Sequence, residues 1–276
     1  MEIRIQVTLT VSEGKRVIAR AIASLPEVRK ALEKGKILLK GGTTVSAVAE
    51  ELAGRPLKIS GRISPRGTRG TINKTLQGHC LLLMAGKSEI VDHNLKEVIE
   101  TLKPGDVVVI GANAIDLDGN AAMCIGAPLG GLPGEALGGM MGYGAKVLIT
   151  AGLEKLIPGR ISASIRAAGR NAMTQSQGMA VGMVPLIGQV FTETDALKAL
   201  AEVACTVIAK GGIDGAEGST TLVVVGEGSE VSKVVTLINE LRNSQVSGIP
   251  ESLEECQPGT SSCGNHNSCM YKSGKK

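Results

Sequence analysis

Short apolar runs alternate with amphipathic stretches along most of this chain, and this alternation limits the folds that it can adopt. The apolar runs cover residues 36–40, 79–84, 106–111, 146–150 and 220–226. Runs of this length without a polar side indicate strands that are buried on both faces. Between them, apolar residues recur at helical spacing, as at Val45, Val48 and Leu52. The pattern predicts an α/β fold with a mostly parallel, Rossmann-like sheet and helices on both faces.

The same pattern predicts the domain organisation. Residues 1–246 are expected to form a single α/β domain, which begins with a strand and a helix over residues 1–35. Pro26 lies inside that helical stretch and is expected to divide it. From residue 247 the composition shifts towards Ser, Gly, Asn, Pro and Lys, so residues 247–276 are expected to form a cysteine-containing C-terminal tail.

Two further elements are expected from local patterns. Residues 193–208 carry apolar side chains at helical spacing and are expected to form one helix. Residues 121–126 are expected to form a strand that pairs beside the strand at 106–111.

Composition argues against several classes of partner. The net charge is only +4, and the chain has one Phe, two Tyr and no Trp. Because it lacks an aromatic platform on which bases could stack, a nucleic-acid partner is not expected. No apolar run reaches the length of about 20 residues that a membrane span needs. We therefore expect a cytoplasmic homo-oligomer with reduced cysteines and a small anionic metabolite as its partner.

The stretch "KGGTTVSAVAEEL" predicts an anion-binding turn. Gly41 and Gly42 separate an apolar strand from a helix and allow a ligand to approach the backbone. Thr43 and Thr44 place hydroxyl groups at the helix N-terminus, where free N–H groups and the helix dipole favour an anion. The alternative is a tight turn that a threonine caps.

The stretch "GRISPRGTRG" adds positive charge shortly after this turn. It contains Arg62, Arg66 and Arg69, whose guanidinium groups can bind carboxylate or phosphate at two points. We expect at least one of these arginines to face the same ligand as the glycine–threonine turn. The alternative is a basic loop exposed to solvent.

Polar residues follow a buried strand in the stretch "VVVIGANAIDLDGNAAMCIGA". The strand ends at Gly111, a candidate ligand-binding residue, and Asn113 and Asp116 follow as candidate catalytic residues. Ligands of open α/β sheets bind beyond the carboxyl ends of the strands, which is where these residues are expected to lie. Asp118 and Gly119 are typical of a turn, so the alternative is that the polar side chains only stabilise that turn.

The last two features resemble those of a known superfamily over residues 36–150 or so. "KGGTTVSAVAEEL" resembles the phosphate loop of ribose-5-phosphate isomerases, and "VVVIGANAIDLDGNAAMCIGA" is similar to a segment of methylthioribose-1-phosphate isomerases and initiation factor 2B-related proteins. Together they resemble the NagB/RpiA/CoA transferase-like superfamily. The resemblance implies a sugar-phosphate isomerase or an acyl/CoA-type transferase.

Two positions depart from that superfamily's pattern. The catalytic aspartate of the isomerases falls on Asn113 here, and an amide cannot act as a general base at neutral pH. The glutamate nucleophile of the CoA transferases has no clear counterpart, although Glu135 and Glu217 come nearest. The resemblance therefore implies the fold and leaves the reaction open.

The tail contains a possible set of metal ligands. Cys256, Cys263, His266 and Cys269 match the ligand types of a Cys₃His zinc site or of an iron–sulfur cluster with one non-cysteine ligand. Their spacing lacks the Cys-x₂-Cys pair typical of zinc sites. The alternative is a tail with incidental cysteines.

The sequence thus favours a protein that binds a small phosphorylated or carboxylated metabolite at the carboxyl edge of its sheet. Isomerisation or acyl/CoA-type transfer is the expected chemistry if the protein is an enzyme. A non-catalytic sensing or regulatory module is the main alternative, and a metalloprotein with its centre in the tail is a weaker one.

Overall fold

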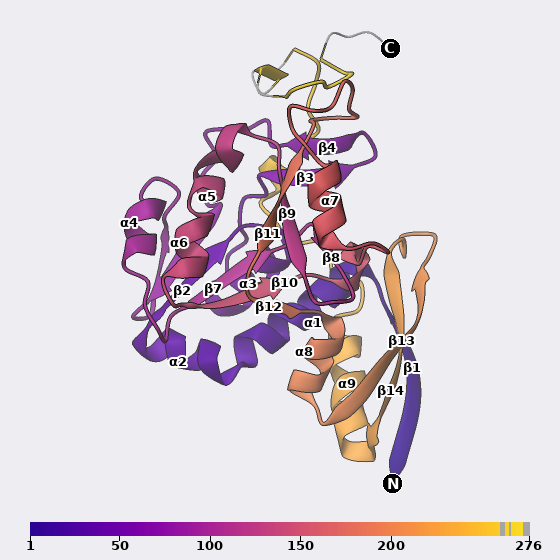
Figure 1. Ribbon diagram of the computed structural model, residues 1–276. Helices are drawn as coiled ribbons and strands as arrows, with labels where there is room; N and C mark the ends of the chain where they lie inside the picture. Colours follow the sequence, from indigo (N-terminus) through magenta and orange to yellow (C-terminus); the bar gives the residue numbers. More distant parts are fainter. Residues whose placement is uncertain (260–262, 265, 273–276) are drawn as a thin grey trace.

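Six strands form the central sheet of the computed structural model, which describes residues 1–259, 263–264 and 266–272. In sheet order they are β12 (Gln189–Phe191), β10 (Lys146–Thr150), β7 (Val107–Gly111), β2 (Lys36–Lys40), β5 (Cys80–Met84) and β6 (Lys87–Ile90) (Figure 1). The first four strands run parallel, whereas β5 and β6 are paired antiparallel. The α/β class is confirmed, but the sheet is mixed, and only one part of it has the expected parallel pairing.

The antiparallel part of the sheet ends in a tight hairpin. Ala85 and Gly86 connect β5 to β6, and both have positive φ angles, of 51° and 73°. This backbone geometry fits the twist of a two-stranded hairpin. The edge strand β6 is therefore joined to β5 by a turn and not by a crossover helix.

Helices cover both faces of this sheet. One face packs against α1 (Val11–Ser24), α2 (Pro26–Lys34) and α3 (Thr43–Ala53), and the other against α4 (Leu95–Glu100) and α6 (Leu137–Gly142), which follows α5 (Gly131–Glu135). Alternate strand residues point to opposite faces of the sheet, so Leu39 packs with α1–α3 and Leu38 packs with α4 and α6. Pro26 is the first residue of α2, which confirms that it divides the helical stretch.

A second, antiparallel sheet lies beside the first set of helices. It consists of β1 (Glu2–Leu9), β14 (Ser219–Glu227) and β13 (Val203–Gly211), and it packs with α8 (Glu193–Leu200) and α9 (Gly228–Glu240) (Figure 1). The expectation of one helix over 193–208 is wrong, because α8 ends at Leu200 and β13 begins at Val203. The β-branched residues Val203, Thr206 and Val207 suit the strand, which pairs with β14 along its length.

Two small sheets lie near the carboxyl ends of the parallel strands. One consists of β8 (Ala114–Ile115), β9 (Ala121–Ile125) and β11 (Gly182–Leu186), which packs with α7 (Ile161–Ala167). The other is the hairpin of β3 (Gly61–Ser64) and β4 (Gly67–Gly70) (Figure 1). The expected strand at 121–126 exists, but its expected position beside β7 is wrong. The turn after Asp116 folds the chain back, so that β9 pairs with β8 and β11 instead.

In the described part of the chain, no helix has the length and apolar character needed to cross a bilayer.

Candidate functional site

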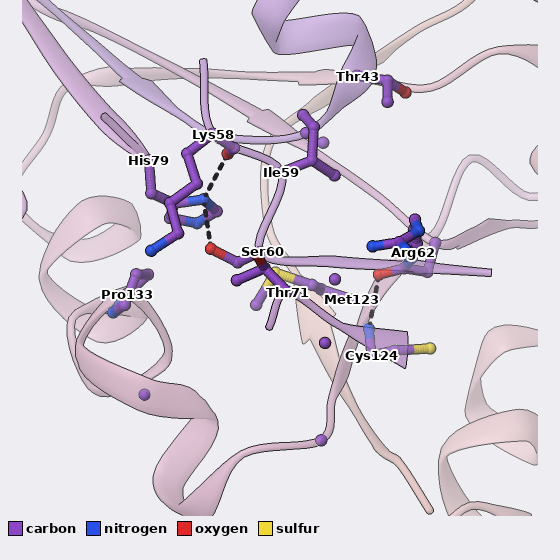
Figure 2. A pocket seen from close by; sticks show the side chains of 18 of the residues that line it. Thr43, Lys58, Ile59, Ser60, Arg62, Thr71, His79, Met123, Cys124 and Pro133 are labelled. Atoms are coloured by element: carbon purple, nitrogen blue, oxygen red, sulfur yellow. Dashed lines mark hydrogen bonds between the residues drawn. The ribbon is translucent and has the colours of Figure 1, made fainter. Parts of the chain in front are cut away.

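A cavity of about 1330 Å³ lies at the carboxyl ends of the parallel strands. Lys40, Gly111 and Thr150, the last residues of β2, β7 and β10, all line it. Further walls come from the N-terminus of α3, the β3–β4 hairpin and β9 (Figure 2). Open α/β sheets bind their ligands at this edge, so the cavity is the candidate functional site.

Several residues singled out in the sequence line this one cavity: Gly41, Gly42, Thr43, Thr44, Arg62, Gly111 and Asn113. Helix α3 has Gly42 as its N-cap, and no side chain of the described residues caps it. Thr43 and Thr44 are the first two helical residues, so neither threonine is the cap. The N-terminus of α3 therefore presents uncapped N–H groups and two hydroxyl-bearing residues at the cavity wall.

Gly41 is required by the close approach of an imidazole. Its N–H donates to the carbonyl oxygen of His79 at 2.7 Å. A Cβ atom at position 41 would lie only 2.4 Å from Nδ1 of His79. A side chain there would displace the ring, so Gly41 positions His79 in the cavity wall.

His79 is a neutral, buried side chain that lines the cavity. Its Nδ1 lies 2.9 Å from Oγ of Ser60 and 3.2 Å from the carbonyl oxygen of Lys58, as Figure 2 shows. Because a carbonyl oxygen only accepts, the tautomer with the proton on Nδ1 satisfies both contacts. Burial lowers the pKa of His79 to about 4, and the nearby charge of Lys40 acts in the same direction. The ring is therefore neutral at physiological pH, with Nε2 as its basic nitrogen.

The carboxylate of Asp92 organises the backbone that holds His79. It accepts the N–H groups of Gly78, His79 and Cys80 at 2.8, 3.1 and 2.6 Å. Asp92 also lines the cavity, and these three hydrogen bonds stabilise its carboxylate.

Lys40 is a buried cation in this wall without a carboxylate partner in the described part of the chain. Its side chain is 6 % exposed, and its Nζ donates to the thioether sulfur of Met123 at 2.8 Å. A thioether is a weak acceptor, so it compensates little for the lost hydration of an ammonium group. Burial lowers the pKa of Lys40 to about 8.

A second group of charges lines another part of the cavity. Nζ of Lys15 lies 3.5 Å from Oε1 of Glu154, and neither carboxylate oxygen of Glu154 receives a hydrogen bond from the described residues. Burial lowers the pKa of the adjacent Lys155, and the charge of Lys15 lowers it further. Glu193 lies near Glu154, outside the cavity lining formed by the described residues, and burial raises the pKa of its carboxyl to about 7. Its Oε2 accepts the N–H of Leu153 at 2.8 Å.

The two candidate catalytic residues lie differently. Asn113 lines the cavity, but its Oδ1 accepts the N–H of Cys124 at 2.9 Å and joins the strands there. Asp116 is absent from the cavity lining formed by the described residues. Its oxygens accept the N–H groups of Ile161 at 2.9 Å and of Asn120 at 2.9 Å. The hydrogen bond from Ile161 is the largest cause of its lowered pKa, so Asp116 stabilises the turn, and its catalytic role remains a prediction.

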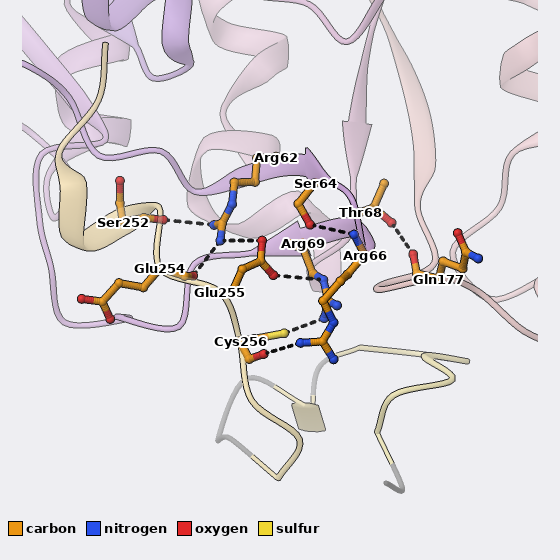
Figure 3. A network of polar contacts seen from close by, with 10 residues as sticks. All are labelled: Arg62, Ser64, Arg66, Thr68, Arg69, Gln177, Ser252, Glu254, Glu255 and Cys256. Atoms are coloured by element: carbon orange, nitrogen blue, oxygen red, sulfur yellow. Dashed lines mark hydrogen bonds and ion pairs between the residues drawn. The ribbon is translucent and has the colours of Figure 1, made fainter. Parts of the chain in front are cut away.

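Arg62 reaches both the cavity and the C-terminal segment. It lines the cavity, yet its guanidinium donates to the carbonyl oxygens of Ser252 and Glu254 at 3.2 and 2.6 Å (Figure 3). It also lies 3.4 Å from Oε1 of Glu255. Much of its donor capacity is therefore used inside the protein.

Arg66 and Arg69 bind the C-terminal segment and not the cavity. Arg66 donates to the carbonyl oxygen of Cys256 at 3.2 Å, and Arg69 donates to Sγ of the same residue at 2.6 Å (Figure 3). Both guanidinium groups lie over the ring of Tyr271, at 4.7 and 4.8 Å from its centroid. The structure shows both arginines in contact with the C-terminal segment. A ligand-binding role for them stays a prediction.

The proposed metal ligands of the tail are also placed by these contacts. In the described ranges, no group of three or more His, Cys, Asp or Glu side chains is placed to hold a metal ion. Cys256 is buried against Arg69, and the buried His266 lines the cavity beside Gly70, as part of its wall. Cys263 and Cys269 are half-buried. Zinc or iron–sulfur binding at the tail remains a prediction.

Sequence reasoning missed most of the charged and imidazole side chains of the cavity. The missed residues are Lys15, Lys40, Lys58, Lys74, His79, Asp92, His93, Glu154 and Lys155. One signal was present: a lysine ends the apolar run "KILLK" directly before the glycine pair. A charged residue at the carboxyl end of a buried strand is expensive to bury, and it points to the ligand edge of the sheet.

Searches of protein-family models, of curated proteins and of solved structures found no match for this chain.

Proposed function

We propose that the cavity at the carboxyl edge of the sheet binds a small phosphorylated or carboxylated metabolite. The charge of its lining carries the proposal. Among the residues that the structure describes, two carboxylates line the cavity, those of Asp92 and Glu154. The first is occupied by three backbone N–H groups, and the second lies beside Lys15. The described part of the lining also contains six lysine and arginine side chains: Lys15, Lys40, Lys58, Arg62, Lys74 and Lys155.

Burial strengthens this preference for an anion. Desolvation lowers the pKa values of Lys40, Lys58 and Lys155, which means that their charged forms lack full compensation within the protein. An anion in the cavity would supply it. The N–H groups at the start of α3 would add donors without any further charge.

The resemblance to sugar-phosphate isomerases and CoA transferases supports the same ligand class. The cavity is above the usual range of about 300–1000 Å³ for small-ligand sites. It has room for a sugar phosphate or for part of an acyl-CoA ester. If the protein is catalytic, we propose isomerisation or acyl/CoA-type transfer as its reaction.

Calorimetric titration tests the proposal with matched pairs of ligands. Ribose 5-phosphate, acetyl-CoA and inorganic pyrophosphate are titrated into the full chain, with ribose as the uncharged control. At least one anion should bind, ribose should not, and binding should weaken as salt is added. Binding of ribose as tight as that of ribose 5-phosphate, or no heat from any of the anions, would contradict the proposal.

A pair of lysine variants locates the binding site. Lys58→Met removes a cation from the cavity wall and should weaken binding at least about tenfold, the effect of losing one charge-assisted contact. Lys87→Met removes an exposed lysine from β6 and should leave the affinity unchanged. Equal effects of both variants would place the anion elsewhere.

A non-catalytic sensing module is the second candidate, and one observation favours it. Asn113 places an amide, not a carboxyl, in the cavity lining, and the nearby Asp116 is occupied by its turn. An isomerase exchanges a hydrogen beside the substrate carbonyl with solvent, whereas a sensor does not. Proton NMR of a bound sugar phosphate in D₂O therefore separates the two candidates.

A further inference from the structure

Lys40 differs from the other cations of the cavity in its surroundings. It ends β2 in the middle of the sheet, where Ile110 of β7 and Cys80 of β5 are its neighbours in register. Its Nζ donates to the sulfur of Met123. Among the described residues, no carboxylate forms an ion pair with it. Such a site makes the amine of Lys40 easier to deprotonate than that of an exposed lysine, so a larger share of it is uncharged near neutral pH.

An imidazole lines the same cavity as this amine. His79 directly precedes Cys80, which is the register partner of Lys40, and its carbonyl oxygen accepts the N–H of Gly41. Both Lys40 and His79 line the cavity. The tautomer with the proton on Nδ1 leaves Nε2 of His79 as an acceptor that can exchange a proton with a reacting group.

We propose that Lys40 forms an imine with the aldehyde or ketone group of the anionic metabolite that the cavity binds. This inference rests on the proposed function, because the anion site formed by the other lysines and by the N-terminus of α3 must hold the metabolite. It adds the chemical class of the ligand: a phosphorylated or carboxylated compound with a free carbonyl group.

The reaction needs no reagent besides the ligand. The uncharged Nζ of Lys40 attacks the carbonyl carbon, and a C–N bond forms as the carbonyl π bond opens onto oxygen. The resulting carbinolamine loses its oxygen as water, with two protons that come from the amine nitrogen, and a C=N bond remains. His79, whose Nε2 accepts a proton in the same cavity, is the candidate to carry one of these protons from nitrogen to oxygen. Addition of water reverses the sequence and releases the ligand.

Reductive trapping tests the imine directly. The full chain is incubated with dihydroxyacetone phosphate or, separately, with pyruvate, in the presence of sodium cyanoborohydride. Reduction converts an imine to a stable secondary amine, which adds the mass of the probe minus one oxygen atom. We expect one adduct per chain, located on Lys40 by peptide mapping, and labelled at least about tenfold more than the exposed Lys87. The two probes distinguish a phosphate from a carboxylate ligand.

Two variants and a competitor control the trapping experiment. Lys40→Met should abolish the adduct while the protein stays folded in thermal denaturation, and Lys87→Met, which removes an exposed lysine of β6 outside the cavity lining, should leave the label on Lys40. Glycerol 3-phosphate, which has no carbonyl group, should compete with dihydroxyacetone phosphate. Label spread over surface lysines, or label that survives in Lys40→Met, would overturn the inference. Peptide mapping of the native protein after labelling shows which lysine carries the adduct, even if the Lys40→Met variant fails to fold.

The binding data separate the two proposals. If glycerol 3-phosphate stabilises the protein but neither carbonyl probe is trapped, the imine is wrong and the anion site stands. If no anion binds and nothing is trapped, both are wrong.

Discussion

At the scale of single residues, the burial of Lys40 makes the free energy of unfolding depend on pH. The pKa of this lysine is about 8 in the folded protein and near its usual value of 10.5 in the unfolded chain. Between these values the unfolded chain binds more protons, so the stability of the native protein rises with pH through this window. Below pH 8 the folded protein bears the whole cost of the buried charge.

Replacing Lys40 by Met should therefore stabilise the protein near neutral pH. One unit of pKa shift corresponds to about 1.4 kcal/mol, so the gain is of order 3 kcal/mol at pH 7 and vanishes near pH 10.5. Urea unfolding at pH 7 and at pH 10 measures it, with Lys87→Met as the exposed control. A gain of the same size at both pH values would mean that better packing, and not the charge, causes the effect.

Glu193 should show the opposite dependence on pH. Burial raises the pKa of this carboxyl from 4.5 to about 7, so the folded protein binds a proton in this window that the unfolded chain has lost. The native protein therefore loses stability as pH rises from 4.5 to 7. Glu193→Gln keeps an oxygen for the N–H of Leu153 and should be more stable than the native protein by up to about 3 kcal/mol above pH 7.

Unfolding curves at pH 5 and pH 8 check this second prediction. The difference between Glu193→Gln and the native protein should be small at pH 5 and large at pH 8. A variant that is less stable at pH 8 would show that the ionised carboxylate is compensated by the nearby lysines.

At the scale of elements, two neighbouring glycines of α6 report how closely it packs against α4. A Cβ atom at Gly139 would lie 2.5 Å from Cγ2 of Ile99 in α4, whereas one at Gly138 would meet no atom of the described residues within 4 Å. Gly139→Ala should therefore destabilise the protein by about 1–3 kcal/mol through overpacking. Gly138→Ala should stabilise it by up to about 1 kcal/mol, because alanine favours the helix. Chemical denaturation of both variants measures the contrast, and equal effects would contradict the close contact.

The elements that the sequence predicts well are those whose signal is local. The strands β2, β7 and β10 are short apolar runs, and the start of α2 at Pro26 follows from the fixed φ of proline. The strand β13 was missed because "EVACTVIA" has no polar–apolar alternation and faces solvent along most of its length. Its state is decided by pairing with β14, a contact that a local pattern does not contain. The antiparallel direction of β5 was missed for the same reason, because it is decided by pairing with β2.

At the scale of the whole molecule, the candidate site combines a part that can be predicted with a part that cannot. Gly41, Thr43 and Gly111 could be assigned to one edge of the sheet, because parallel strands end on the same side. The partners of Arg66 and Arg69 could not, because the sequence does not show that the chain returns more than 180 residues later to meet them. These long-range contacts hold the C-terminal segment against the β3–β4 hairpin, where His266 becomes part of the cavity wall.

The attachment of this C-terminal segment depends on Arg69. Its side chain is only 1 % exposed, and it contacts Sγ of Cys256, Oε2 of Glu255 at 3.7 Å and the ring of Tyr271. Arg69→Met keeps a side chain of similar length but removes the charge and every donor. The segment should then separate from the β3–β4 hairpin more often and expose the buried thiol of Cys256.

The reaction of Cys256 with iodoacetamide, followed by peptide mapping, measures this opening. Labelling should be at least about tenfold faster in Arg69→Met, since losing a hydrogen bond to a charged group costs about 1.5–3 kcal/mol. Arg69→Lys keeps the charge but not the planar fork, so its rate should be intermediate. Arg20→Met, which removes an arginine paired with Glu51 in another part of the molecule, should leave the rate unchanged. Equal rates in Arg69→Met and the native protein would show that other contacts hold the segment. A faster rate accompanied by weaker ligand binding would show that the segment also shapes the cavity, to which it contributes His266.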